Sequence, residues 1–242
     1  MQPSFVTPAV PERGRSVGSL LRDGLRRPGG RKALSVLSVL LFLAGVATFA
    51  YPVGTDLYGR YQQGNLHSQF AGTTYTAHYT AHYTAHTIAS GDVLTKLVIA
   101  KKGIELTVLV VEGTTPAALR AGAGHYVGKP LPGDAGNVAI AGHRTTFGRP
   151  LNHLDQMRQG DEVLLYTPTQ IYLYVVVKPF AGHANPWVTT PKDVSVAENL
   201  PGQRALTLTT CNPKGSARQR LVLRLELDPK LTERVSRRGP VR

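Results

Sequence analysis

The sequence contains very little cysteine: Cys211 is the only one among 242 residues. A single cysteine cannot form an internal disulfide, so the apolar core has to stabilise the fold and the thiol is left free for chemistry. The sequence also lacks the Cys/His spacing of a structural zinc site and the carboxylate cluster of a calcium site. We therefore expect no metal and no other cofactor.

Acidic residues are scarce as well, with 15 Asp and Glu against 28 Lys and Arg and a net charge of +13. Residues 1–32 hold seven basic and two acidic residues, net +5, and residues 229–242 hold five and one, net +4. No basic helix with interleaved aromatic residues accompanies these charges, which argues against nucleic-acid binding. Attraction to an anionic membrane surface or a cell wall explains them better.

A long apolar run occurs at residues 33–51, which include no charged residue. This length suits a transmembrane helix, and the apolar run is longer than that of a cleaved signal peptide. The basic residues precede it, so the positive-inside tendency places residues 1–32, a disordered basic segment, in the cytoplasm. Everything after Tyr51 is then extracytoplasmic.

Residues 52–91 are polar and predict a linker between the membrane and a folded domain. Within it the tetrapeptide Tyr-Thr-Ala-His occurs three times in succession, at residues 75–86. On a helix its histidines would share one face and could bind a transition metal. Thr and Tyr are poor helix formers, which favours a low-complexity spacer, and whether the repeat has a role stays open.

Residues 92–229 predict the folded domain, followed by a basic tail at 230–242. Short β-rich runs dominate it, while helices are expected only at 115–120 and near 151–157. The glycine-rich residues 122–136 are expected to form a loop, and residues 178–203 a long irregular segment. About eight short strands with few helices predict a mainly β fold, a closed or nearly closed barrel.

Two of the expected strands end in complementary chemistry. The run 205–211 alternates and ends on Cys211, and the run 136–142 leads to His143. A thiol at a strand exit is half exposed, and arginines follow it at Arg218 and Arg220, where a guanidinium would favour the thiolate. A cysteine and a histidine distant in sequence are a candidate catalytic pair.

These motifs resemble the sortase transpeptidases of Gram-positive bacteria. The resemblance rests on Thr-Leu-Thr-Thr-Cys at 207–211, on the arginine after it and on Ala-Gly-His at 141–143. Residues 142–148 and 211–220 are most similar to the class E enzymes of actinobacteria, and the likeness extends over about 93–227. The resemblance implies an eight-stranded sortase barrel behind the transmembrane helix.

The resemblance also implies roles for the residues. Cys211 would be the nucleophile and His143 the general acid and base; the arginine that steadies the oxyanion would be Arg220, with Arg218 as the alternative. Thr210 and Thr209 would line the substrate site. Residues 178–203, including Trp187, would grip the peptide. Asn212 departs from the pattern, since many class E members carry His there, and His125, His153 and His183 are expected at the surface or the core edge.

The implied function is cell-wall anchoring. The substrates would be secreted proteins with a C-terminal Leu-Ala-x-Thr-Gly-like or Leu-Pro-x-Thr-Gly-like sorting signal, cut between Thr and Gly and joined to the amine of a peptidoglycan precursor. Alternatives are a non-catalytic, membrane-tethered β-domain that binds wall or partner protein, and a pilus-polymerising sortase. The latter usually carries an Asp-Pro-aromatic lid, which 52–90 lacks, and the Ser-His-Gly-Cys-like motif of L,D-type transpeptidases is missing.

Overall fold

The computed structural model describes residues 28–72, 88–167, 170–179 and 182–238. Three predicted features therefore lie partly or wholly outside the described residues: the basic segment up to residue 27, the repeat at 75–86 and the last four residues of the basic tail. The chain forms two compact units, Met1–Tyr51 and Pro52–Arg242.

The first described element is one long helix, α2 (Pro28–Gly72), which includes the predicted transmembrane run. Its stretch Gly29–Phe70 is the one helix among the described residues that is long and apolar enough to cross a membrane. Pro52 lies inside the helix at the boundary between the two units, where it removes one backbone hydrogen bond. The sequence predicted a linker from residue 52, whereas the chain remains helical as far as Gly72.

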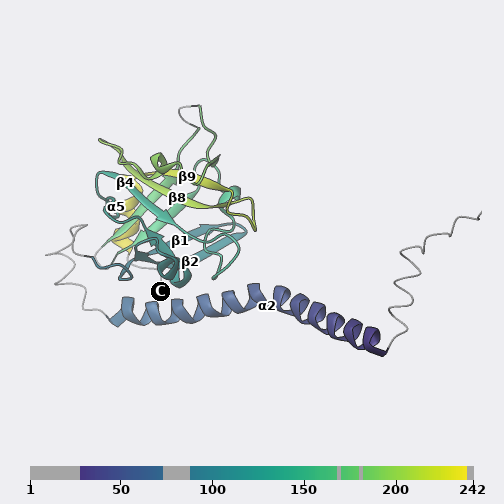
Figure 1. Ribbon diagram of the computed structural model, residues 1–242. Helices are drawn as coiled ribbons and strands as arrows, with labels where there is room; N and C mark the ends of the chain where they lie inside the picture. Colours follow the sequence, from purple (N-terminus) through teal and green to yellow (C-terminus); the bar gives the residue numbers. More distant parts are fainter. Residues whose placement is uncertain (1–27, 73–87, 168–169, 180–181, 239–242) are drawn as a thin grey trace, which may run out of the picture. The chain divides into compact units, whose positions relative to one another are not determined.

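The second unit is built around a closed sheet (Figure 1). Eight strands follow the order β6-β5-β1-β2-β3-β4-β8-β9, and the pairing of β6 with β9 closes the ring; β7 pairs only with the first half of β9. The strands are β1 (Val93–Lys101), β2 (Ile104–Glu112), β3 (Ala123–His125), β4 (Gly136–Ala141), β5 (Glu162–Tyr166), β6 (Ile171–Val176), β7 (Trp187–Thr189), β8 (Arg204–Asn212) and β9 (Gln219–Leu227). This confirms the predicted eight-stranded barrel.

The barrel interior is filled by large apolar side chains, among them Leu97, Ile140, Met157, Leu165 and Leu208, none more than marginally exposed. Apart from Met157, which follows a 3-10 turn, these residues lie on strands, whose two-residue period directs alternate side chains into the barrel. Because the ring is closed, its strands have neighbours on both sides and few free edges. Hydrogen bonds to these neighbours hold the residues at the strand ends in place.

Short helices complete the unit: α4 (Pro116–Ala121), the 3-10 turns η1 (Leu154–Gln156) and η2 (Val194–Ala197), and α5 (Pro229–Arg238). The α4 prediction is confirmed, with the Thr115 hydroxyl accepting from the Ala118 N–H at 3.3 Å. Two loop predictions were wrong in part, because residues 122–136 contain β3 and residues 178–203 contain β7 and η2. The basic tail forms α5 as far as Arg238.

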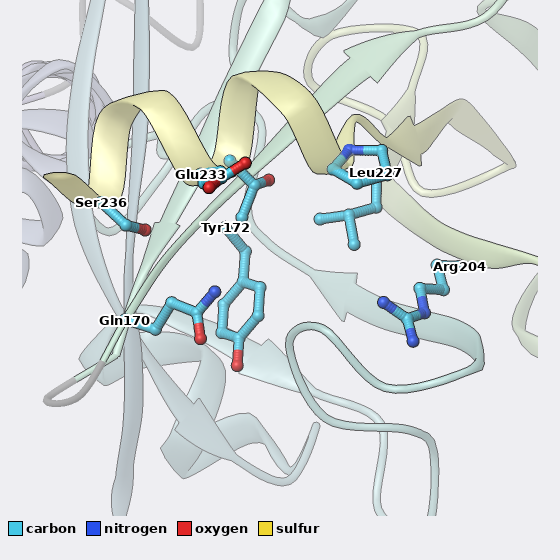
Figure 2. A pocket seen from close by; sticks show the side chains of 8 residues that line it. Gln170, Tyr172, Arg204, Leu227, Glu233 and Ser236 are labelled. Atoms are coloured by element: carbon cyan, nitrogen blue, oxygen red, sulfur yellow. The ribbon is translucent and has the colours of Figure 1, made fainter.

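A cavity of about 420 Å³ lies under α5 (Figure 2). Tyr172 and Gln170 line it from one side and Arg204 from the other, while Glu233 and Ser236 project from the helix. Arg204 is the first residue of β8, and Cys211 comes seven residues later, about 23 Å along an extended strand. The cavity is therefore at the opposite end of the strand from the predicted nucleophile.

Candidate active site

Parallel pairing of β4 with β8 brings the two predicted strand exits together. The register pairs Ala141 with Thr209, and the pairing continues through the Gly142 N–H, which donates to the Thr209 carbonyl at 3.1 Å. Continuing this register by two residues aligns His143 with Cys211. β4 ends at Ala141, so this extension places the segment with His143 beside the end of β8 that carries Cys211, a proximity that alternation alone does not indicate.

The antiparallel hairpin of β8 and β9 places the arginine. Its register pairs Cys211 with Arg220, and Arg220 Nη1 lies 3.8 Å from Cys211 Sγ. The same Nη1 donates to the Ala217 and Gln219 carbonyls at 3.1 Å, which fixes the guanidinium beside the sulfur. Arg218 is exposed and precedes β9, so Arg220 is the arginine that the hairpin brings to the thiol.

His143 is half-buried, with its ring 5.0 Å from that of Phe147 at an interplanar angle of 42°. Burial lowers the pKa of His143, and the positive charge of Arg120 lowers it further. Among the described residues no side chain or carbonyl hydrogen-bonds to its ring nitrogens. The imidazole therefore has both nitrogens available and is mainly neutral at pH 7.

Arg144 is a residue of the site that the sequence analysis missed. It is buried, 5% exposed, and its Nη1 donates to the Cys211 carbonyl at 3.3 Å and to Asn212 Oδ1 at 2.6 Å. Its Nη2 lies 3.3 Å from an oxygen of Asp155. Arg144 follows His143 directly, so its contacts tie the segment of His143 to the end of the strand that carries Cys211. In the sequence, the only sign of this role was a charged residue next to His143. The groups of Cys211 and Asn212 that Arg144 contacts belong to another strand, so the sequence did not indicate them.

The same contacts hold the side chain of Asn212 in place. Its side-chain oxygen accepts from Arg144, and its Nδ2 donates to Gln219 Oε1 at 3.0 Å across the hairpin. Asn212 therefore bridges Arg144 and the start of β9, on either side of Cys211.

Thr209 and Thr210, predicted to line a substrate site, are each 2% exposed. The Thr210 hydroxyl donates to the Gly142 carbonyl at 2.8 Å, and the Thr209 hydroxyl lies 3.1 Å from that of Tyr126. Both hydroxyls are thus engaged within the barrel wall, close to the two strand exits. Substrate contact by either residue stays a prediction.

The other histidines lie elsewhere. The expectation for His125 was wrong, because it is in the barrel wall with no exposed surface, hydrogen-bonded to Glu112. His153 contacts the amides of Asn152 and Gln156, and His183 lies beside Trp187, with ring centroids 5.7 Å apart. Within the described ranges, no three His, Cys, Asp or Glu side chains are grouped so as to hold a metal ion.

Comparison with known proteins gives the same family throughout. The sortase domain model matches residues 97–228, more than half of the chain. Sortase SrtE1 of Streptomyces coelicolor is 28% identical over 134 residues, which cover 50% of this chain and 36% of that protein. Sortase D of Bacillus subtilis is 29% identical over 117 residues, 47% of this chain and 54% of that protein. The chain thus spans about half, or less, of the length of these relatives.

Solved structures agree with this likeness. Sortase E from Streptomyces avermitilis matches with a TM-score of 0.50 and 35% identity, covering 58% of this chain and 90% of that one. SrtF sortase from Corynebacterium diphtheriae matches with a TM-score of 0.54 and 29% identity, covering 59% and 88%. The Streptomyces relatives support a class E-like sortase of the actinobacterial type. On the match of its domain, this chain belongs to the sortase family, whose members are cysteine transpeptidases.

Proposed function

We propose that this chain is a membrane-anchored transpeptidase that cuts a C-terminal Leu-Ala-x-Thr-Gly-like or Leu-Pro-x-Thr-Gly-like sorting signal between Thr and Gly. It then transfers the secreted protein to an amine of a cell-wall precursor. The observation that carries the proposal is the guanidinium of Arg220 beside the lone thiol of Cys211, 3.8 Å from its sulfur. The aligned imidazole of His143 supplies the third group.

In the first half of the reaction the Cys211 thiolate attacks the carbonyl carbon of the threonine, and the carbonyl electrons move to the oxygen. Arg220 stabilises the negative charge that develops there. When the carbonyl re-forms, the Thr–Gly bond breaks, and protonated His143 gives its proton to the departing glycine amine. The product is a thioester between the threonine and Cys211.

In the second half an amine of the acceptor attacks the thioester while neutral His143 takes its proton. The new amide bond forms, and the thiolate of Cys211 leaves. The lowered pKa of His143 favours the neutral form that this step uses. The acid step uses the protonated form, whose share rises as the pH falls. One imidazole can thus serve both halves because it regains in the second the proton that it gave up in the first.

We also propose the topology. The apolar part of α2 anchors the chain as a single pass, and the basic residues before it keep the N-terminus in the cytoplasm. The barrel is then extracytoplasmic, on the side where secreted proteins and cell-wall precursors meet. The partners follow from this placement: proteins with sorting signals, the precursor amine and the membrane.

The test uses the full chain in detergent micelles with a quenched peptide that contains Leu-Ala-x-Thr-Gly, and a second peptide that contains Leu-Pro-x-Thr-Gly. We expect fluorescence release and, without an amine, a thioester adduct on Cys211 visible by mass spectrometry. Cys211→Ala is the matched control and should abolish both signals while the thermal unfolding curve stays unchanged. Equal turnover by Cys211→Ala would refute the transpeptidase and leave a tethered β-domain.

A further inference from the structure

The second half of α2, residues 52–72, is packed on the barrel; we call it the docking helix. Leu66 is 8% exposed because it enters a small apolar cluster with partners from β1, β2 and α4. The partners are Val93, Leu109, Val111 and Ala118, with Phe70 packed alongside. Burial of this apolar side chain stabilises the packing of the helix turn against the sheet.

Gln63 adds polar contacts that fix the orientation of the docking helix. Its Oε1 accepts from the Leu109 N–H at 2.7 Å, and its Nε2 donates to the Ala121 carbonyl at 2.6 Å. Both partners are backbone groups, one of β2 and one at the end of α4. Satisfying a donor and an acceptor with one amide demands a defined rotation of the helix about its axis.

With that rotation, the docking helix meets residues 147–149, the loop that follows His143. Asp56 Oδ2 pairs with Arg149 Nη2 at 2.8 Å, and Asp56 Oδ1 accepts from the Gly148 N–H at 3.2 Å. At Gly59 the two backbones touch: a Cβ there would lie 2.8 Å from the carbonyl carbon of Phe147. Only a glycine therefore allows the helix this close to the loop.

The loop needs this support because its own conformation is unfavourable. Phe147 and Arg149 both have φ of 52°, a left-handed conformation that costs energy for residues other than glycine. A cavity of about 320 Å³ remains between the docking helix and the loop, so close packing does not hold the loop on every side. Besides its backbone hydrogen bond from the Arg149 N–H to the Thr146 carbonyl at 3.0 Å, the loop is held by the contacts of Asp56 and Gly59 from the docking helix.

The ring of Phe147 connects this contact to the site. Tyr58 of the docking helix meets Phe147 edge to face, with centroids 6.2 Å apart at 78°, and Phe147 meets His143 at 5.0 Å. His143 lies beyond the last residue of β4, so the neighbouring ring of Phe147 limits the rotation of its imidazole and its contact with water.

We propose that the docking helix is a positioning element of the active site: it holds the 147–149 loop and thereby seats Phe147 against His143. The inference rests on the proposed function only for the role of His143. The helix is then a working part of the catalytic unit rather than a passive spacer, although it lies close in sequence to the apolar segment. Tyr58, Gly59 and Phe147 are positioning residues.

The main test replaces Gly59 by Ala in the full chain, with Gly64→Ala as the matched control. Both changes add one methyl group to the same helix, but nothing lies within 4 Å of a Cβ at Gly64. We measure the titration of His143 by NMR of histidine-labelled protein in micelles, with the signal assigned by its loss in His143→Gln. In Gly59→Ala the pKa should rise toward the ordinary value of 6.5 as Phe147 withdraws and water enters. Gly64→Ala should titrate as the wild type does.

A second pair of variants serves if Gly59→Ala does not fold. Tyr58 is 43% exposed, so Tyr58→Ala should fold, and Tyr58→Phe keeps the ring that contacts Phe147. We expect the titration of His143 to move in Tyr58→Ala and to return in Tyr58→Phe. Apart from the Tyr58 phenol, these variants retain the charged or titratable groups on the elements around the imidazole, namely Asp56, Arg120, Arg144, Arg149, Cys211 and Arg220.

Peptide turnover gives the second readout. Displacing the imidazole should lower kcat about tenfold or more in Gly59→Ala, with KM little changed, since misplaced groups cost rate rather than binding. The titration needs no peptide, so a wild type that cuts no peptide would count against the proposed function and leave this inference testable. Titration of His143 at the wild-type pKa in both Gly59→Ala and Tyr58→Ala would overturn the positioning role.

Discussion

His125 lies on β3 and pairs with Ile140 of β4, and His143 follows the end of β4 by two residues. Their surroundings are opposite. His125 has no exposed surface, its Nδ1 lies 2.7 Å from Glu112 Oε2 and its Nε2 lies 3.1 Å from the Pro130 carbonyl oxygen. His143 is half-buried beside Phe147, with no hydrogen bond to its ring from the residues that the structure describes.

The difference shows what makes a histidine available for chemistry. A carbonyl oxygen only accepts, so Nε2 of His125 carries a hydrogen, and one further proton lies between Nδ1 and Glu112. Passing either proton to a substrate would leave a buried polar group without a partner, at a cost of about 1–3 kcal/mol. His143 has no such commitment. Unused hydrogen-bonding capacity, more than residue type, separates the candidate acid from the structural histidine.

The sharpest way to break this comparison is His143→Gln. Loss of a general acid and base costs about 10²–10⁴-fold in rate, so kcat/KM should fall by that factor. The thermal unfolding midpoint should change little, because the ring makes no buried hydrogen bond that folding requires. Peptide cleavage and a thermal melt on the same sample measure the two effects. Wild-type turnover in His143→Gln would give its role to another group.

The complementary experiment disrupts the buried contact between Glu112 and His125. Glu112→Ala leaves the Nδ1 of His125 without a partner, and a buried polar group left without a partner costs about 1–3 kcal/mol in the free energy of unfolding. Glu112→Gln should cost less, because the amide can donate to a neutral ring. Urea unfolding measures the free energy of unfolding of both variants. Activity per folded molecule should stay near the wild-type value, and a selective loss of kcat would place His125 in the reaction.

A residue held at the site can also be compared with an exposed neighbour for the two arginines near the start of β9. Arg220→Ala removes the guanidinium beside Cys211 Sγ, and loss of one oxyanion-stabilising donor costs about 10²–10³-fold in kcat. Arg218→Ala changes an exposed side chain before the strand and should alter kcat by no more than about twofold. The kcat of Arg220→Lys should lie between those of the wild type and Arg220→Ala, because lysine keeps the positive charge but lacks the planar guanidinium with its paired N–H donors. Equal losses in both alanine variants would leave the choice of arginine open.

The sequence predicted the parts of the site that lie at strand exits. The strands before Cys211 and His143 have β-rich residues and alternate, so their ends could be placed within a residue or two. The predicted loop 122–136 contains β3, which the sequence did not indicate because Ala-Gly-His has weak β propensity and the strand depends on its pairing with β2 and β4. His125 was therefore expected at the surface or the core edge.

Two other features could not be predicted for the same reason. Residues 52–72 contain Pro, Gly, Thr and Tyr, which weaken helix propensity, and their helix is held by contacts with β2, α4 and the 147–149 loop. Arg144 meets its partners across the parallel pairing of β4 with β8. Such contacts depend on strand order, which no local pattern contains.

The smallest expected effect concerns the charge on Arg120, which is exposed on α4. Its positive charge disfavours protonated His143, so Arg120→Gln should raise the pKa of His143 toward 6.5 while burial keeps it below that value. The acid step uses the protonated ring, so the fall of kcat/KM at high pH should move to higher pH. Lys102→Gln removes an exposed charge from the turn between β1 and β2 and is the control. High salt should shift the wild type in the same direction and the variant less, because salt screens exposed charges. If the pKa stays at the wild-type value in Arg120→Gln, burial alone sets it, and the contrast between the two histidines is one of packing without a charge component.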